Sequence, residues 1–382
     1  MNMKKRTLNL LGLLLILASC ADDKLDVFPE STVFSDEKIK HTHLMDGKHI
    51  ELEPITNIYR FEIVDSLLIC SGTAVDNPLK MHIYNLNSGK RIVSFANEGR
   101  GPEEFLRVDA FYVSRISKEI HIIDISQQQI TCYSIDALLK DNLSGPTQKV
   151  SFSESSFTPE FMIDPNNFLC EVAMPYKSSD VITKVKYPSF EKASAVGYPP
   201  LEKFDSINLA RHYQGVFGRN VSYNDEARKI VVAYSTTDLL EIYDQDLNRL
   251  ARTHGPDQFF PEYQVTGTPI PSPTVSYKGK TLNDIGVMGL NVKPVRGVAR
   301  FGYRSVTTTT NGVYAVYSGD IFPENTDSIP SMKSIYFFDY QGKAQRKYTV
   351  ESGNVSVIRV DENKGILYAS YTGDLIAYKM KQ

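Results

Sequence analysis

Short apolar runs that each follow a polar turn recur along the chain. Most of the turns are built from Asn, Asp, Gly and Pro, residues that tolerate or preset turn backbone angles. Six runs align in this way, at residues 67–70, 120–123, 168–170, 230–233, 313–316 and 366–369. Repeated short strands separated by turn signals predict an all-β protein built from repeats.

A second pattern follows most of these runs and predicts a β-hairpin: an apolar-rich strand, a tight polar turn and a returning basic strand. Copies lie at residues 81–90, 240–249 and 335–343. With the strand before each first turn, every unit has four strands. Six such units predict a six-bladed β-propeller. A two-sheet sandwich, the alternative, needs fewer strands and leaves the repeats unexplained.

The two ends of the repeat region predict how the ring closes. The last unit stops one strand short, after residues 374–380, whereas an alternating segment at residues 48–53 precedes the first unit. We therefore expect this N-terminal strand to complete the last blade, which removes exposed sheet edges. The predicted propeller domain is residues 48–382.

The N-terminus has the form of a bacterial lipoprotein signal. A basic head precedes an apolar stretch at residues 8–18, which is too short to be a membrane span with its own flanks and ends in Leu-Ala-Ser-Cys. This ending resembles a lipobox, whose cysteine receives a diacylglycerol. We expect a signal peptide over residues 1–19, lipid on Cys20 and a tether over residues 20–47. The alternative is an ordinary cleaved signal with a coincidental cysteine.

Charge and cysteine content restrict the partners. The net charge is −3, and removing residues 1–19 takes away three basic residues and no acid, which leaves −6. A nucleic-acid-binding domain would be strongly basic, so we expect no nucleic acid partner. Cys70, Cys132 and Cys170 are odd in number and lie in apolar or alternating runs. They are expected to be buried free thiols.

The lipobox, a short acidic tether, the six units and two short motifs make the chain similar to the TolB-like six-bladed propeller lipoproteins of Gram-negative envelopes. The motifs are Gly-Arg-Gly-Pro-Glu-Glu-Phe at residues 99–105 and Val-Tyr-Ala-Val-Tyr-Ser-Gly at residues 313–319. The resemblance covers nearly the whole mature chain and implies the fold, but it carries no catalytic residue set. In the family the link more usually reads Gly-Pro-Gly-Glu-Phe, and Glu103 replaces its last glycine here.

The resemblance also implies an address in the cell envelope. The acidic pair Asp22 and Asp23, directly after the lipobox, resembles signals that send such lipoproteins to the outer membrane. We expect an outer-membrane lipoprotein on the periplasmic side or at the cell surface. Its contact with the membrane would be through the lipid anchor alone.

Long irregular segments predict the binding face. In a propeller, the link from the outermost strand of one blade to the innermost strand of the next lies on the same face as the link between second and third strands. Four such links, at residues 97–105, 199–217, 256–301 and 320–332, are expected to share one face, called here the loop-rich face. Insertions gathered on one side of a repeat protein usually mark its binding side.

Residues on this face, or at its borders, are the candidate ligand contacts. They are Arg100, Glu103, Glu104, Arg211, His212, Tyr213, Arg296, Arg300 and Arg304. Arginine can fork onto a carboxylate or phosphate, so a ring of arginines favours an anionic ligand. The alternative is that these arginines bind neighbouring loop carbonyls and glutamates. The link at residues 97–105 has a structural interpretation as well: its glycines and proline suit a chain that crosses tightly from one blade to the next.

Catalytic and metal motifs are missing from the sequence. It has no Gly-x-Ser-x-Gly elbow and no His-Glu-x-x-His. A calcium-loop-like start at residues 244–248 continues with Arg249 where such a loop requires glycine. His41, His43 and His49 lack a rigid frame for a metal. We expect no cofactor and no specific metal site.

The expected function is therefore binding or scaffolding, by a monomer, with a protein or glycan of the envelope as partner. The alternative is a hydrolase or lyase of an extracellular glycan or ester, with acid and base residues drawn from several blades around the channel. For that alternative, His212 and Glu104 are the starting points that the sequence offers.

Overall fold

A computed structural model of the protein divides the chain into two compact units, residues 1–30 and residues 31–382. All described strands belong to the second unit. The described residues are 28, 30–44, 47–53, 55, 57–73, 80–101, 103–140, 145–152, 157–172, 180–199, 213–266, 270–271, 275–277, 280–282, 287–288, 291–324, 330–351, 353–371 and 373–380. Within these ranges, no helix is long and apolar enough to cross a membrane.

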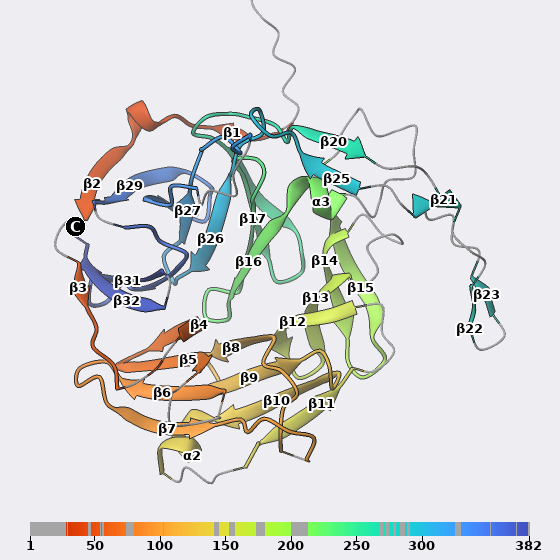
Figure 1. The fold of residues 1–382 in the computed structure, drawn as a ribbon, viewed down its shortest axis with the longest axis vertical. Helices are drawn as coiled ribbons and strands as arrows, with labels where there is room; N and C mark the ends of the chain where they lie inside the picture. Colours follow the sequence, from red (N-terminus) through yellow and green to blue (C-terminus); the bar gives the residue numbers. More distant parts are fainter. Residues whose placement is uncertain are drawn as a thin grey trace, which may run out of the picture. The chain divides into compact units, whose positions relative to one another are not determined.

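Six antiparallel sheets form the blades of a six-bladed β-propeller, as predicted (Figure 1). Blades 1 to 3 consist of β4 (Asn57–Val64), β5 (Leu67–Thr73), β6 (Met81–Asn85), β7 (Arg91–Phe95), β8 (Ala110–Ser114), β9 (Glu119–Asp124), β10 (Gln129–Ser134), β11 (Gln148–Ser151), β12 (Phe157–Asp164), β13 (Asn167–Val172), β14 (Asp180–Lys186) and β15 (Glu191–Gly197). Blades 4 to 6 consist of β16 (Arg219–Asn224), β17 (Lys229–Tyr234), β18 (Leu239–Asp244), β19 (Arg249–His254), β26 (Tyr303–Thr308), β27 (Val313–Tyr317), β28 (Ser334–Phe338), β29 (Ala344–Val350), β30 (Val357–Asp361), β31 (Ile366–Tyr371), β32 (Asp374–Lys379) and β3 (Lys48–His49).

The six apolar runs of the sequence are the second strands of the six blades. They are rich in β-branched and aromatic residues, which suit a pleated surface. Because a blade is covered on both faces by its neighbours, these strands are apolar on both faces; in β17, for example, Ile230 to Tyr234 are all fully buried. The first strands surround the central channel in the order β4, β8, β12, β16, β26 and β30. Neighbours in this order contact each other, with β12 and β16 linked by the ion pair between Glu160 and Arg219.

The ring closes as the sequence predicted. β3 pairs antiparallel with β32, with Lys48 opposite Ala377 and His49 opposite Ile376. The N–H of Ile50 still donates to the carbonyl of Leu375, at 2.9 Å. The observed strand is shorter than the expected segment of residues 48–53.

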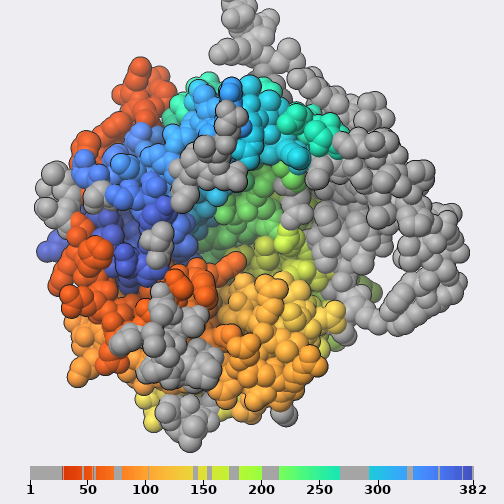
Figure 2. Space-filling view, in the orientation of Figure 1, coloured from red at the N-terminus to blue at the C-terminus, as the bar shows by residue number. Residues whose placement is uncertain are grey.

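The predicted boundary of the tether is corrected at its C-terminal end. Two strands lie within residues 20–47: β1 (Thr32–Val33) pairs parallel with β19, and β2 (Lys40–Leu44) pairs parallel with β29. A 3₁₀ turn, η1 (Asp36–Lys38), joins them. We call residues 31–44 the rim strap. In Figure 2 the strap is red-orange and runs beside the blue of blade 5.

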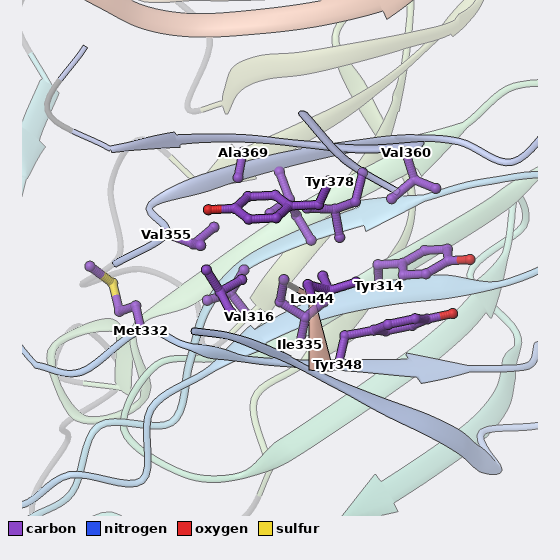
Figure 3. Close-up of a cluster of buried hydrophobic side chains, with 13 residues drawn as sticks. Leu44, Tyr314, Val316, Met332, Ile335, Tyr348, Val355, Val360, Ala369 and Tyr378 are labelled. Carbon is purple, nitrogen blue, oxygen red and sulfur yellow. The ribbon is translucent and has the colours of Figure 1, made fainter. Parts of the chain in front are cut away.

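Apolar and polar side chains spaced irregularly along the rim strap attach it to the blades, so they form no period that the sequence pattern could reveal. Leu44 is buried among residues of blades 5 and 6, including Ile335 and Tyr348 (Figure 3). Asp36 accepts hydrogen bonds from the hydroxyl of Tyr336, at 2.6 Å, and from Nζ of Lys347, at 2.5 Å. Phe34 packs edge-on against Tyr336 and Phe338, with ring centroids 5.5 Å apart, and Ile39 is buried in the core shared by blades 4 and 5. Backbone pairing of β1 and β2 completes the attachment.

We expect Leu44→Ala to lower the free energy of unfolding by about 2–5 kcal/mol, because it removes a buried side chain and leaves a cavity. The measurement is denaturant unfolding of the full chain. His43→Ala is the matched control on the same strand, since its side chain is 62% exposed. Equal effects of the two variants would show that the strap is not packed on the blades as described.

The long link between blades 4 and 5 carries further two-stranded ladders, and two short helices lie in other links. β20 (Tyr263–Thr266) pairs with β25 (Asn291–Pro294), β21 (Ile270–Pro271) with β24 (Val287–Met288), and β22 (Val275–Tyr277) with β23 (Lys280–Leu282). The helices are α2 (Ile135–Lys140), before β11, and α3 (Tyr213–Phe217), before β16. All four links assigned to the loop-rich face join the strands that the sequence predicted.

Candidate functional site

The link at residues 97–105 is a tight loop bonded to itself. The N–H of Gly99 donates to the carbonyl of Phe105, and that of Phe105 to the carbonyl of Asn97. The carboxylate of Glu104 accepts the N–H of Gly101 at 2.7 Å. A Cβ on Gly99 would lie 1.9 Å from that carboxylate, so a larger residue here would displace the side chain of Glu104. These contacts fit the tight-crossing interpretation of the link.

The remaining candidates of this link, Arg100 and Glu103, are exposed. Neither lines the cavity described below. Arg211, His212 and Cys20 lie outside the described residues, and Tyr213 is described only as the first residue of α3.

Two of the arginine candidates bind neighbouring loop groups. Arg296 donates to the carbonyl of Pro323, at 3.2 Å, and Arg300 to that of Gly319, at 3.3 Å. Arg300 also lies 3.8 Å from the carboxylate of Asp257. For these two arginines the contacts agree with the alternative interpretation of the sequence, in which the arginines bind neighbouring loop groups and not a ligand.

Arg304 is different, because it lines a cavity of about 550 Å³ at the end of the channel where the first strands begin. The blade-to-blade links enter the first strands at this end, so the cavity is on the loop-rich face. All six blades contribute to its lining through their first strands or the residues directly before them.

Three β-bulges shape this end of the channel. The register of the first strand shifts at Tyr59 in β4, at Glu160 in β12 and at Arg304 in β26. A bulge inserts one residue into a strand and redirects side chains, and bulges are frequent next to binding sites. All three bulged residues line the cavity. The bulges occur in alternate blades, so they are spaced around the ring.

Charged side chains of the first strands, or of the residues directly before them, form a ring in the cavity, and Glu171 of β13 adds a second acid from blade 3. In ring order, the members of the ring are Arg60, Asp109, Glu160, Arg219, Arg304 and Arg359. The arginines come from four consecutive blades, 4, 5, 6 and 1, and the acids from blades 2 and 3. The cavity therefore has a basic side and an acidic side.

The acidic side is neutralised by one buried guanidinium. Arg219 forms a bidentate pair with Glu160, at 3.0 and 3.2 Å, and lies 3.5 Å from Glu171. Burial opposes the charge of Arg219, but the two glutamates outweigh it and raise its pKa. Burial is the main cause that raises the pKa of Glu171, although Arg219 acts against it.

Two further charges have partners at close range. Arg359 pairs with Glu62 at 2.5 Å. The carboxylate of Asp109 accepts the N–H of Ile125 at 2.9 Å and lies 3.1 Å from the guanidinium of Arg107. These groups have little capacity left for a ligand.

Arg60 and Arg304 are the two members of the ring with no hydrogen bond or ion pair to any residue in the described ranges. Both are open to solvent within the cavity. The surrounding protein nevertheless lowers the pKa of each, mainly through burial; for Arg60 the nearby Arg359 adds to this effect. Arg304 lies over the ring of Phe301, 5.4 Å from its centroid.

At the opposite end of the channel, some charged side chains bind neighbouring groups. Asp225, in the β16–β17 turn of blade 4, accepts the hydroxyl of Ser114 at 2.7 Å and the N–H of Ile116 at 3.1 Å, both from blade 2. Lys364 lies 2.8 Å from Asp361.

Sequence reasoning named Arg304 but missed Arg60, Arg219, Arg359 and Glu160. A signal was present: each is a charged residue within the strand before a second-strand turn, in segments such as Asn-Ile-Tyr-Arg-Phe-Glu-Ile-Val at residues 57–64. Aligning the first strands, as well as the second strands, would have placed these residues around one channel. No cluster of three metal-ligating side chains occurs in the part of the chain that the structure describes.

Comparison with known proteins identifies the fold. The family described as TolB-like 6-blade propeller-like matches residues 34–363. A crystal structure of a DUF4221 family member from Bacteroides vulgatus is 11% identical and superposes with a TM-score of 0.52, covering 88% of this chain and 94% of that one. A putative exported protein from Bacteroides fragilis is 12% identical, with a TM-score of 0.47 and coverage of 92% and 100%. No curated protein matches the chain.

Proposed function

Because the chain belongs to the family of TolB-like six-bladed propellers, we propose that it is a binding protein of the cell envelope without chemistry of its own. It takes a group of its ligand, an envelope glycan or protein, into the cavity on the loop-rich face. The observation that carries this proposal is the set of three bulges that direct Tyr59, Glu160 and Arg304 into one cavity. Ligand sites are typically concave, with a few placed polar groups.

The charge arrangement favours binding over hydrolysis. A glycosidase needs two carboxyl groups on either side of the scissile bond, one of them free to give up a proton. Here Glu160 and Glu171 both contact the guanidinium of Arg219, and Asp109 is held by Arg107 and a backbone N–H. These carboxylates are engaged by the protein itself, so they are poor candidates for general acids or bases.

The proposed address rests on the sequence. A lipid on Cys20 and a chain segment that reaches the rim strap at residue 31 would hold the propeller close to the membrane surface. The propeller would then bind its ligand in the cell envelope.

Blocking the cavity tests the proposed function. Thr158 lines the cavity at the loop-rich end, and Thr310 lines the opposite end of the channel. We expect Thr158→Trp to weaken binding of the ligand at least about tenfold, since the indole occupies space that the ligand needs. Thr310→Trp makes the same change at the other end and should leave the affinity unchanged.

The measurement is titration of the purified full chain against a panel of envelope glycans and peptides, with circular dichroism as the check that both variants are folded. Binding that Thr158→Trp does not affect, or that Thr310→Trp abolishes, contradicts the proposal. So does a panel in which no member binds at millimolar concentration.

A further inference from the structure

We propose that the cavity on the loop-rich face recognises an acidic saccharide and that Arg304 and Arg60 bind its carboxylate or sulfate group. This inference rests on the proposed function, because it specifies the ligand of the same cavity. It goes further in assigning the chemical class of that ligand and the two residues that select it.

The charges in the cavity single out these two arginines. Arg219 forms ion pairs with Glu160 and Glu171, and Arg359 forms one with Glu62. Arg60 and Arg304 have no such partner among the residues that the structure describes, yet both line the cavity. Both guanidinium groups are exposed in the cavity, so an anion that enters it can bind them without breaking an existing ion pair.

Arg304 is the stronger of the two anchors. Its neighbours provide no opposing acid, whereas Arg60 lies within electrostatic range of Glu160, Asp109 and Glu62. The bulge at Arg304 directs the side chain into the cavity, and its guanidinium carbon lies over the ring of Phe301. A guanidinium held in this way presents a fork of donors that matches a carboxylate or a sulfate.

The other lining groups fit a saccharide. Tyr59, 61% exposed, lies in the bulge next to Arg60 and presents an aromatic surface at the cavity. Asn220, Thr158 and Ser305 add amide and hydroxyl groups to the lining. An acidic sugar has an apolar C–H face, several hydroxyls and one oxyanion. The C–H face can pack on the aromatic ring, the hydroxyls can bond to the amide and hydroxyl groups, and the oxyanion can bind the arginines. An acidic peptide is the other polymer that carries carboxylates, and the test includes it.

The experiment measures dissociation constants of the full chain for four probes at low and at physiological salt. The probes are trigalacturonic acid, its fully methyl-esterified neutral form, galactose 6-sulfate and triglutamate. We expect trigalacturonic acid or galactose 6-sulfate to bind, with the methyl ester at least about tenfold weaker than trigalacturonic acid, since charge-assisted hydrogen bonds are lost. The stronger of the two acidic saccharides indicates whether the natural group is a carboxylate or a sulfate.

Variants assign the binding to the two residues. Arg304→Gln should weaken binding of the acidic saccharide about 10- to 100-fold, and Arg60→Gln by a smaller factor, without changing affinity for the methyl ester. The matched control is Arg300→Gln, an arginine of the same face that binds Gly319. It should bind the acidic saccharide like the wild type.

Three results would overturn the inference. They are equal affinity for trigalacturonic acid and its methyl ester, binding of triglutamate in the absence of saccharide binding, and no binding of either acidic saccharide. These results do not by themselves decide the proposed function. That function stands if another ligand binds and Thr158→Trp blocks its binding. The proposed function fails if no ligand binds in a way that depends on the cavity.

Discussion

Arg219→Gln is expected to lower the free energy of unfolding by about 2–4 kcal/mol at pH 8. This is somewhat less than the roughly 3–5 kcal/mol for breaking a fully buried ion pair, because the two glutamates are 25% and 34% exposed. The side chain of Arg219 is only 6% exposed and serves both Glu160 and Glu171. Glutamine keeps much of the volume but removes the charge. Two carboxylates are then left facing each other in a partly buried site without a cation.

The loss should depend on pH in a defined direction. The pKa of Glu171 is already raised in the folded protein, mainly by burial. A group with a raised folded pKa contributes stability below its unfolded pKa and loses that contribution as the pH rises through the folded value. Removing Arg219 raises the pKa of Glu171 further, so the variant should be closer to wild type at pH 5 than at pH 8.

Denaturant unfolding at both pH values measures this effect. The control is Arg107→Gln, whose guanidinium pairs with Asp109 but is 71% exposed. An exposed pair contributes at most about 1 kcal/mol. A variant at Arg219 that is no less stable than the variant at Arg107, or whose deficit grows at pH 5, would show that Arg219 does not neutralise the acidic side of the cavity.

Cys20→Ala is expected to abolish incorporation of labelled palmitate and to leave the protein out of the membrane fraction or as an uncleaved precursor. Two or three acyl chains, at about 0.8 kcal/mol for each buried methylene, make release of the lipidated protein negligible. Without the thiol no chain is attached. Metabolic labelling followed by fractionation measures both effects.

The propeller of this variant should still fold, because the blades begin well after the signal. Ser19→Ala is the matched control: it changes the residue next to Cys20 and keeps the small residues of the lipobox, so labelling should persist. A wild-type protein that takes up no palmitate, or that fractionates with the cytoplasm, would contradict both the anchor and the envelope role.

The six-bladed architecture could be predicted from the sequence because the second strand of each blade has a recognisable apolar pattern. Blades cover both faces of these strands, so segments such as residues 230–234 are continuously apolar and stand out beside their polar turns. The closing strand β3 was found by a different argument, the missing strand of the last blade. Both inferences depend on patterns that repeat.

The rim strap and the cavity could not be predicted, because the interactions that form them leave little pattern in the sequence. β1 and β2 join the outer edges through backbone hydrogen bonds, and the buried side chains of the strap, Ile39 and Leu44, are five residues apart and fit no strand period. The bulges at Tyr59, Glu160 and Arg304 shift the two-residue period of the first strands, which hides the face that each side chain occupies. Which arginines remain unpaired depends on contacts between blades, and these are distant in sequence.

The most direct test of ligand binding in the cavity is a crystal structure of the full chain with the tightest-binding probe of the panel. We expect the probe in the cavity on the loop-rich face, with an oxyanion within hydrogen-bond distance of the guanidinium of Arg304. A probe bound at the opposite end of the channel, or on the outer rim of the blades, would contradict it.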